Sequence, residues 1–176
     1  MSEEPKAVVN LADLQLHELA PERQESGRYA AQFGEIGRAL GFYRLGCMLH
    51  VVPPGKSAFG AHRHHGCDEM FFILSGTGEY RIGKDRLPVG PGDCLGAPAG
   101  GKHHQIVNTG SEDLKYLGFS NIGDADVVES EEGPTSVIIG TRGNIYTSAT
   151  YYGRGVLTPQ TRREDPERLL REEPGA

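Results

Sequence analysis

The sequence predicts an all-β domain, and three observations support this prediction. Glycine and proline are abundant, because the 176 residues include 25 Gly and 11 Pro, about a fifth of the chain against roughly 12% in average proteins. Glycine permits positive φ and proline fixes φ, so both favour chain reversals. From Phe42 onward, short segments of strand character alternate with Gly/Pro turns at roughly 8–12-residue spacing, as in a sandwich or small barrel. No alternation of strand and helix patterns competes with this reading.

The sequence predicts that the chain divides into three regions. Residues 1–41 form an N-terminal arm, in which the leucines of 11–19 fit a short strand followed by a helical turn and the glycines of 27–41 predict mostly irregular structure. Residues 42–122 form the barrel core, with strands expected at 45–52, 69–75, 79–83, 86–89, 94–97, 104–108 and 114–120. Residues 123–176 form a C-terminal extension that adds strands to the same domain. It starts with an acidic stretch at 124–134, which is followed by a strand at 135–140. Residues 142–156 add a hairpin or cover an edge of the sheet. The charged tail at 159–176 is either a helix exposed to solvent or a frayed terminus.

Charge and hydropathy exclude two classes of partner. The formal net charge is −6 and the sequence pI is near 5.6, so the basic field that holds nucleic acid is missing. No apolar run approaches the roughly 20 residues that span a bilayer, and the acidic N-terminus does not resemble a signal peptide.

The three cysteines, Cys47, Cys67 and Cys94, form no CxxC pair. They indicate free thiols in a reducing compartment, so we expect a cytoplasmic protein with no membrane partner.

Five of the seven histidines lie within 43 residues of the core region, at positions 62, 64, 65, 103 and 104. His62 and His64 are two residues apart, so on an extended strand both imidazoles point to one face. Glu69 lies at an odd offset from them, and a turn at 65–68 is needed to return its carboxylate on the next antiparallel strand. His104 begins a later strand and completes a set of three nitrogens and one oxygen. Such a set suits a divalent first-row metal with open coordination positions.

Residues 55–76 and 92–108 resemble the two motifs of the cupin family. The first motif is matched by His62, His64, Glu69 and Gly76, and the second by Gly92, Pro98, Gly100 and Asn108. The second motif carries one extra residue, since counting from Gly100 selects His103 and counting back from Asn108 selects His104. We prefer His104, which shares a strand face with Ile106 and Asn108, because a loop absorbs an insertion more easily than a strand.

The resemblance covers about Pro53 to Ser120 and implies a double-stranded β-helix, the cupin jelly-roll barrel. It implies that the equivalents of His62, His64, Glu69 and His104 hold the metal, and that the protein forms a homodimer, as cupins frequently do. It implies less about the reaction, because cupins include dioxygenases, isomerases, decarboxylases, storage proteins and small-molecule sensors.

The function expected from these residues is metal-dependent chemistry on an unidentified small molecule. We favour an enzyme of dioxygenase or isomerase type that uses one divalent transition metal, either Fe, Mn, Ni, Zn or Cu, with Glu69 as a ligand and catalytic proton acceptor. Strand parity assigns Phe71, Ile73 and Ile106 to the substrate pocket, with ordinary barrel core as the alternative for Phe71 and Ile73. Candidates for a phenol near the metal are Tyr43, Tyr80, Tyr116, Tyr151 and Tyr152. The alternative function is a non-catalytic cupin that binds or senses a small molecule, and a structural cupin without metal is disfavoured because no ligand is missing.

Overall fold

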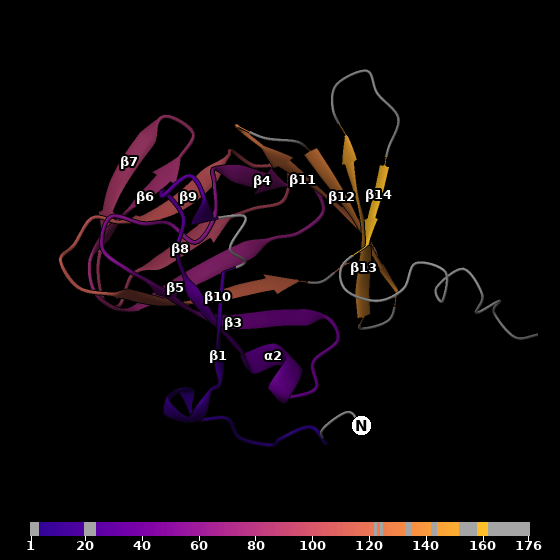
Figure 1. The fold of residues 1–176 in the computed structure, drawn as a ribbon, viewed down its shortest axis with the longest axis horizontal. Helices are drawn as coiled ribbons and strands as arrows, with labels where there is room; N and C mark the ends of the chain where they lie inside the picture. Colours follow the sequence, from indigo (N-terminus) through magenta and orange to yellow (C-terminus); the bar gives the residue numbers. More distant parts are fainter. Residues whose placement is uncertain are drawn as a thin grey trace, which may run out of the picture.

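The protein is a double-stranded β-helix of two antiparallel sheets (Figure 1). The computed structural model describes residues 4–19, 24–121, 123, 125–132, 135–141, 144–151 and 158–161. The first sheet has the strand order β1 (Leu16–Glu18), β2 (Gln32–Glu35), β3 (Leu45–Val52), β10 (Leu114–Asn121), β5 (Glu69–Ser75) and β8 (Cys94–Ala97). The second sheet has the order β14 (Thr158–Thr161), β13 (Asn144–Tyr151), β12 (Thr135–Thr141), β11 (Ala125–Ser130), β4 (His62–His64), β9 (His104–Asn108), β6 (Gly78–Ile82) and β7 (Asp85–Val89).

The main core lies between the two sheets, where alternate residues of each strand point inward. On β5 the inward residues Phe71 and Ile73 are buried, while Met70 on the other face is exposed. Ile73 and Leu114 from the first sheet and Ile106 from the second belong to one apolar cluster with nine other buried residues. The barrel of the core region is therefore filled mainly by its own side chains, as is usual for small barrels.

The N-terminal arm is more regular than the sequence predicts. A 3₁₀ turn, η1 (Leu11–Asp13), precedes β1, so the expected order of strand and then helical turn is wrong. The side chain of Asn10 accepts a hydrogen bond from the backbone N–H of Ala12, which explains why the turn begins there. β2 pairs with β3, and the short helix α2 (Ile36–Ala39) covers the outer face of the first sheet with a second apolar cluster.

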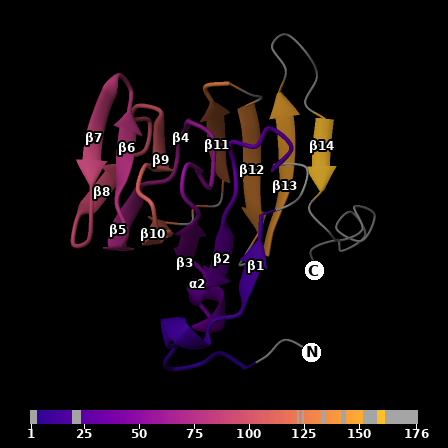
Figure 2. The same ribbon diagram turned by 60° about the vertical axis from the view of Figure 1, so that its left-hand side comes forward.

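The second sheet continues beyond the barrel through β11 into β12, β13 and β14 (Figure 2). The strand expected at 135–140 is present as β12, and β13 pairs with it as a hairpin partner. The acidic stretch, in contrast, contains a strand that the sequence analysis did not predict, β11, which pairs with β4. Most of the charged tail expected at 159–176 lies outside the described residues. None of the described helices is long and apolar enough to cross a membrane, and Cys47, Cys67 and Cys94 are free thiols.

Candidate metal centre

The four residues predicted to hold a metal come together inside the barrel. His62 and His64 lie on β4 and His104 begins β9, and the cross-strand pairing of His62 with His104 sets the two strands in register. Glu69 begins β5 in the opposite sheet, so its carboxylate faces the imidazoles across the interior. We call these four residues the His3Glu cluster.

The turn between β4 and β5 carries the chain from one sheet to the other, and contacts with later strands hold it in place. The Cys67 thiol donates to the Asn121 carbonyl over 2.9 Å, and the backbone N–H of Asp68 donates to the Asn121 side chain over 2.7 Å. Burial is the main cause that raises the pKa of Cys67 to about 12, so this thiol stays protonated. The Cys67 thiol therefore helps to hold the turn, and its hydrogen bond is to Asn121 and not to the His3Glu cluster.

Two of the three distances from Glu69 to the histidines match those between ligands of one ion. Glu69 Oε2 lies 3.0 Å from His104 Nε2, 3.3 Å from His64 Nε2 and 3.9 Å from His62 Nε2. Ligand atoms about 2.1 Å from an ion are about 3.0–3.4 Å apart at right-angled to tetrahedral geometry. His62, Glu69 and His104 offer one ligand atom each within 4.8 Å of one another. His64 is not part of that group and joins the cluster through its approach to Glu69.

Unpaired polar atoms in the cluster point to the same use. Glu69 Oε2 and His104 Nε2 are buried and lie 3.0 Å apart, yet they form no hydrogen bond of acceptable geometry, and neither atom has another hydrogen-bond partner among the described residues. A buried polar atom without a partner costs roughly 1–3 kcal/mol. A divalent cation would satisfy both atoms, so the residues present fit a metal ion.

The hydrogen bonding of His62 and the protonation states of His62 and Glu69 suit metal ligation. His62 Nδ1 donates to the carbonyl of Gly60 over 2.8 Å, and because a carbonyl can only accept, the proton is on Nδ1 and Nε2 is free. Burial, together with the charge of His104, lowers the pKa of His62 to about 4, so the ring is neutral at neutral pH. Burial alone would raise the pKa of Glu69, but the contact with His104 and the charges of the three histidines more than reverse this and lower it.

The sequence analysis missed one functional candidate, Asp126, and left another, Tyr116, undecided among five tyrosines. Asp126, on β11, accepts a hydrogen bond from His64 Nδ1. It was missed because it lies in the acidic stretch, although the adjacent Val127 and Val128 could have indicated a strand. Tyr116 was one of five tyrosines offered, and the structure places this one beside the cluster.

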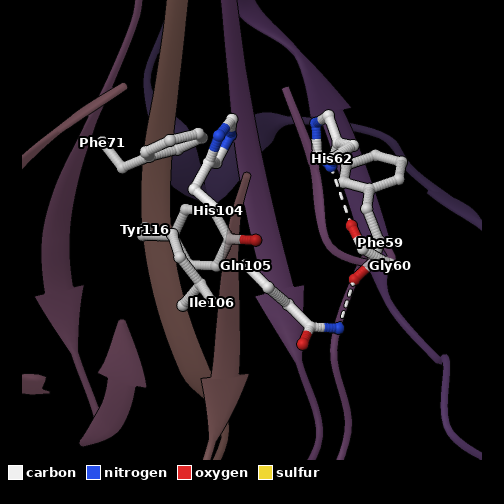
Figure 3. Close-up of a pocket in the computed structure, with 8 residues that line it drawn as sticks. All are labelled: Phe59, Gly60, His62, Phe71, His104, Gln105, Ile106 and Tyr116. Atoms are coloured by element: carbon white, nitrogen blue, oxygen red, sulfur yellow. Dashed lines mark hydrogen bonds between the residues drawn. The ribbon is translucent and has the colours of Figure 1, made fainter. Parts of the chain in front are cut away.

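A small pocket adjoins the His3Glu cluster, with a volume of about 20 Å³, enough for one water molecule. Figure 3 shows its lining, in which the Tyr116 hydroxyl points into the middle of the group: Phe59, Gly60, His62, Phe71, His104, Gln105, Ile106 and Tyr116. Phe71 and Ile106, both predicted for a substrate pocket, are in this lining. Ile73 is not, because it is fully buried in the main core.

His50 packs behind this pocket. Its ring stacks on Tyr116 with centroids 4.5 Å apart and 9° between the planes, and Phe33 meets it edge-on at 5.3 Å. Burial lowers the pKa of His50 to about 4, and burial with the nearby Glu69 charge raises the pKa of Tyr116. Both groups are therefore neutral at neutral pH, and the Tyr116 hydroxyl keeps its proton.

His103, the other candidate for the fourth ligand, lies outside the His3Glu cluster. Its Nε2 is 3.6 Å from Glu129 Oε1, on the outer side of the second sheet. Glu129 also forms an ion pair of 2.7 Å with Arg63. The alternation of side chains along β9 and the preceding loop thus brings His104, and not His103, to Glu69.

Comparison with known proteins agrees with this architecture. Residues 48–120 match the family model described as Cupin domain. An oxalate-binding protein from Thermotoga maritima is 38% identical over 66 residues, which is 38% of this chain and 53% of that protein, so the chain spans about half of the relative's length.

Two solved structures share the fold. A sugar phosphate isomerase of the cupin superfamily from Silicibacter pomeroyi is similar over 84% of this chain and 94% of its own, with a TM-score of 0.72 and 20% identity. A putative sugar phosphate isomerase from Acidithiobacillus ferrooxidans is similar over 79% of this chain and 89% of its own, with a TM-score of 0.66 and 24% identity.

Proposed function

Since this chain belongs to the cupin superfamily through its domain at residues 48–120, we propose that it is a metal-dependent enzyme acting on a small molecule. The His3Glu cluster would hold one divalent transition metal, drawn from Fe, Mn, Ni, Zn and Cu. The observation that carries the proposal is the approach of three imidazole Nε2 atoms to one buried carboxylate oxygen. When bound, the ion supplies Lewis-acid polarisation and open positions for an oxygen ligand.

The charge of the ligand set favours a particular kind of ligand. Three imidazoles that bind through unprotonated nitrogens and one carboxylate contribute a single negative charge, which leaves a divalent centre net positive. Such a centre favours an anionic or electron-rich oxygen atom, such as a carboxylate or an enolate. The remaining pocket wall is apolar at Phe71 and Ile106, and the pocket volume of about 20 Å³ admits only the reacting group of a substrate.

Two protein groups would handle protons at the His3Glu cluster and the pocket that adjoins it. Glu69 is ionised at neutral pH, because its pKa lies below the ordinary value, and its carboxylate is the available acceptor. Tyr116 keeps its proton, because its pKa is raised, and its hydroxyl can donate to a bound oxygen. Tyr116 lines the pocket and Glu69 belongs to the His3Glu cluster that adjoins it. A proton donor and a proton acceptor at neighbouring positions support an isomerase that moves a proton within its substrate over a dioxygenase.

A second candidate function is non-catalytic binding of a small molecule. The relative from Thermotoga maritima is named an oxalate-binding protein, which favours this alternative and suggests a small carboxylate as ligand. Native mass spectrometry of the purified protein separates the two functions. A stoichiometric ligand that survives purification chemically unchanged supports the binding protein, whereas turnover of small oxo- or hydroxy-acids supports the enzyme.

The test of the metal proposal is elemental analysis of protein purified without added metal or chelator. We expect close to one metal ion per chain, and a marked loss of occupancy in His62→Ala and His104→Ala. His103→Ala is the matched control and should retain the wild-type occupancy, because His103 lies outside the cluster. Less than about 0.1 ion per chain, with no binding on titration, would contradict the proposal. An equal loss in His103→Ala would contradict the assignment of His104.

We further propose a cytoplasmic homodimer. The free thiols at Cys47, Cys67 and Cys94 are consistent with a reducing compartment. Sedimentation equilibrium of the full chain tests the dimer, and a mass equal to that of one chain at micromolar concentration would contradict it. We expect no binding to nucleic acid, given the net charge of −6.

A further inference from the structure

A carboxylate from outside the matched cupin domain reaches the His3Glu cluster. Asp126 lies on β11, after the last residue of the family match, and its Oδ2 accepts a hydrogen bond from His64 Nδ1. Its other oxygen, Oδ1, accepts the backbone N–H of Gly66 over 2.8 Å. The Asp126 side chain is only 13% exposed. Both of its oxygens therefore bind the segment that carries His64, and little of the side chain is left for solvent.

The three histidines of the cluster have different partners on the nitrogen that faces away from Glu69. His62 Nδ1 donates to a neutral carbonyl, and His104 Nδ1 has no partner among the described residues. His64 is thus the only one of the three for which the described residues supply a carboxylate. A carboxylate partner fixes the proton on Nδ1, holds the plane of the ring and makes Nε2 a better electron donor toward a metal.

The backbone around Asp126 ties the same two strands together. β11 pairs with β4 in the register Val128 with His64 and Ser130 with His62. The N–H of His65 donates to the Val127 carbonyl over 3.0 Å. On the opposite face of the pair, Glu129 contacts Arg63 over 2.7 Å, away from the cluster. Asp126 therefore contacts a predicted metal ligand, whereas Glu129 lies on the other face of β11 and contacts Arg63.

We propose that Asp126 is a positioning residue of the metal centre, through which metal binding and the docking of β11 on β4 strengthen each other. This inference rests on the proposed metal site. Coupling between two equilibria is reciprocal, so the factor by which docked β11 raises metal affinity is the factor by which the metal favours docking. The C-terminal extension would then contribute a residue to the metal site, in addition to extending the second sheet.

The first test is titration of Co²⁺ alone into metal-free wild type, Asp126→Asn and Glu129→Gln. Glu129→Gln is the control, because it makes the same carboxylate-to-amide change on the same strand but on the outer face of the sheet. We expect Asp126→Asn to weaken Co²⁺ binding by about 10- to 100-fold and to shift the visible absorption bands of the saturated protein. We expect Glu129→Gln to bind within about twofold of wild type, with unchanged bands.

The second test is hydrogen exchange of the backbone amides of His65 and Gly66, with and without Co²⁺. Bound Co²⁺ should slow both amides in wild type, and the slowing should be much smaller in Asp126→Asn measured at saturating Co²⁺. Wild-type affinity, spectrum and protection in Asp126→Asn would overturn the inference, and so would an equal loss in Glu129→Gln, which would reflect general destabilisation of β11. Absence of Co²⁺ binding by wild type would overturn the proposed function as well.

Discussion

Acid should destabilise the metal-free protein through His50, a buried residue outside the His3Glu cluster. Its ring is enclosed by Tyr116 and Phe33, and burial lowers its pKa from 6.5 to about 4. In the unfolded chain the ring is hydrated and has its ordinary pKa near 6.5. Between pH 6.5 and 4 the unfolded chain therefore binds a proton that the folded chain does not, so the free energy of unfolding falls as the pH falls.

The size of the effect follows from the two pKa values. The full difference between about 6.5 and about 4 is worth about 3 kcal/mol once both forms are protonated, at 1.36 kcal/mol for each pKa unit. At pH 5 most of the unfolded chains and few of the folded ones are protonated at His50, and the loss relative to pH 7 is about 2 kcal/mol. His62 changes in the same direction, because its pKa is also lowered to about 4.

Urea unfolding at pH 7 and pH 5, in the presence of a chelator, measures this loss in wild type and in His50→Phe. The variant keeps an aromatic ring but cannot titrate, and His62 contributes equally to both proteins. Each protein is compared with itself, so any packing cost of the larger ring cancels. Wild type should lose about 2 kcal/mol more than His50→Phe between pH 7 and pH 5. An equal loss in the two proteins would show that His50 titrates normally in the fold.

Two further substitutions test the packing of the barrel. Asn108 is fully buried, and its side chain donates to two backbone carbonyls at 2.8 and 2.7 Å. Asn108→Ala should therefore lower the free energy of unfolding by on the order of 3 kcal/mol. A loss below about 1 kcal/mol in urea unfolding would contradict this prediction. Gly76 has a φ of +80°, and an added Cβ would lie 2.6 Å from the Asp113 carbonyl oxygen, whereas Gly55, with φ +74°, has open space around it. Gly76→Ala should therefore lower the thermal midpoint more than Gly55→Ala does, and equal midpoints would refute the steric argument.

The local sequence pattern predicted much of the fold, because the alternation of side chains along a single strand determines which residues face the interior. The spacing of His62 and His64 predicted one common face, and the structure places both imidazoles near Glu69. The strands predicted at 45–52, 69–75, 94–97 and 104–108 have those boundaries in the structure. Turn residues and two-residue periodicity are local properties, so a single sequence is enough to detect them.

What the sequence analysis missed depends on contacts between distant segments. Nothing local distinguishes Tyr116 from the other tyrosines, because its place in the pocket follows from the pairing of β10 with β3 and β5. Asp126 was assigned only to an acidic stretch, because its partner His64 is far away in the sequence and no local pattern links the two residues. Ile73 follows the same inward parity as Phe71, yet it is fully buried in the main core, since parity gives the face of a strand and not the depth along it.

The pairing of β3 with β10 has a consequence for how the protein is made. Leu45 lies opposite Asn121 and Val52 opposite Leu114, so the two strands enclose nearly the whole cupin domain between them. Strand pairings this distant in sequence slow folding, because a long loop must close before the contact forms. A growing chain that has emerged only as far as His104 holds every residue of the His3Glu cluster but has no β10 to close the first sheet around it. We therefore expect metal uptake to follow completion of the barrel on the ribosome, rather than to guide its assembly.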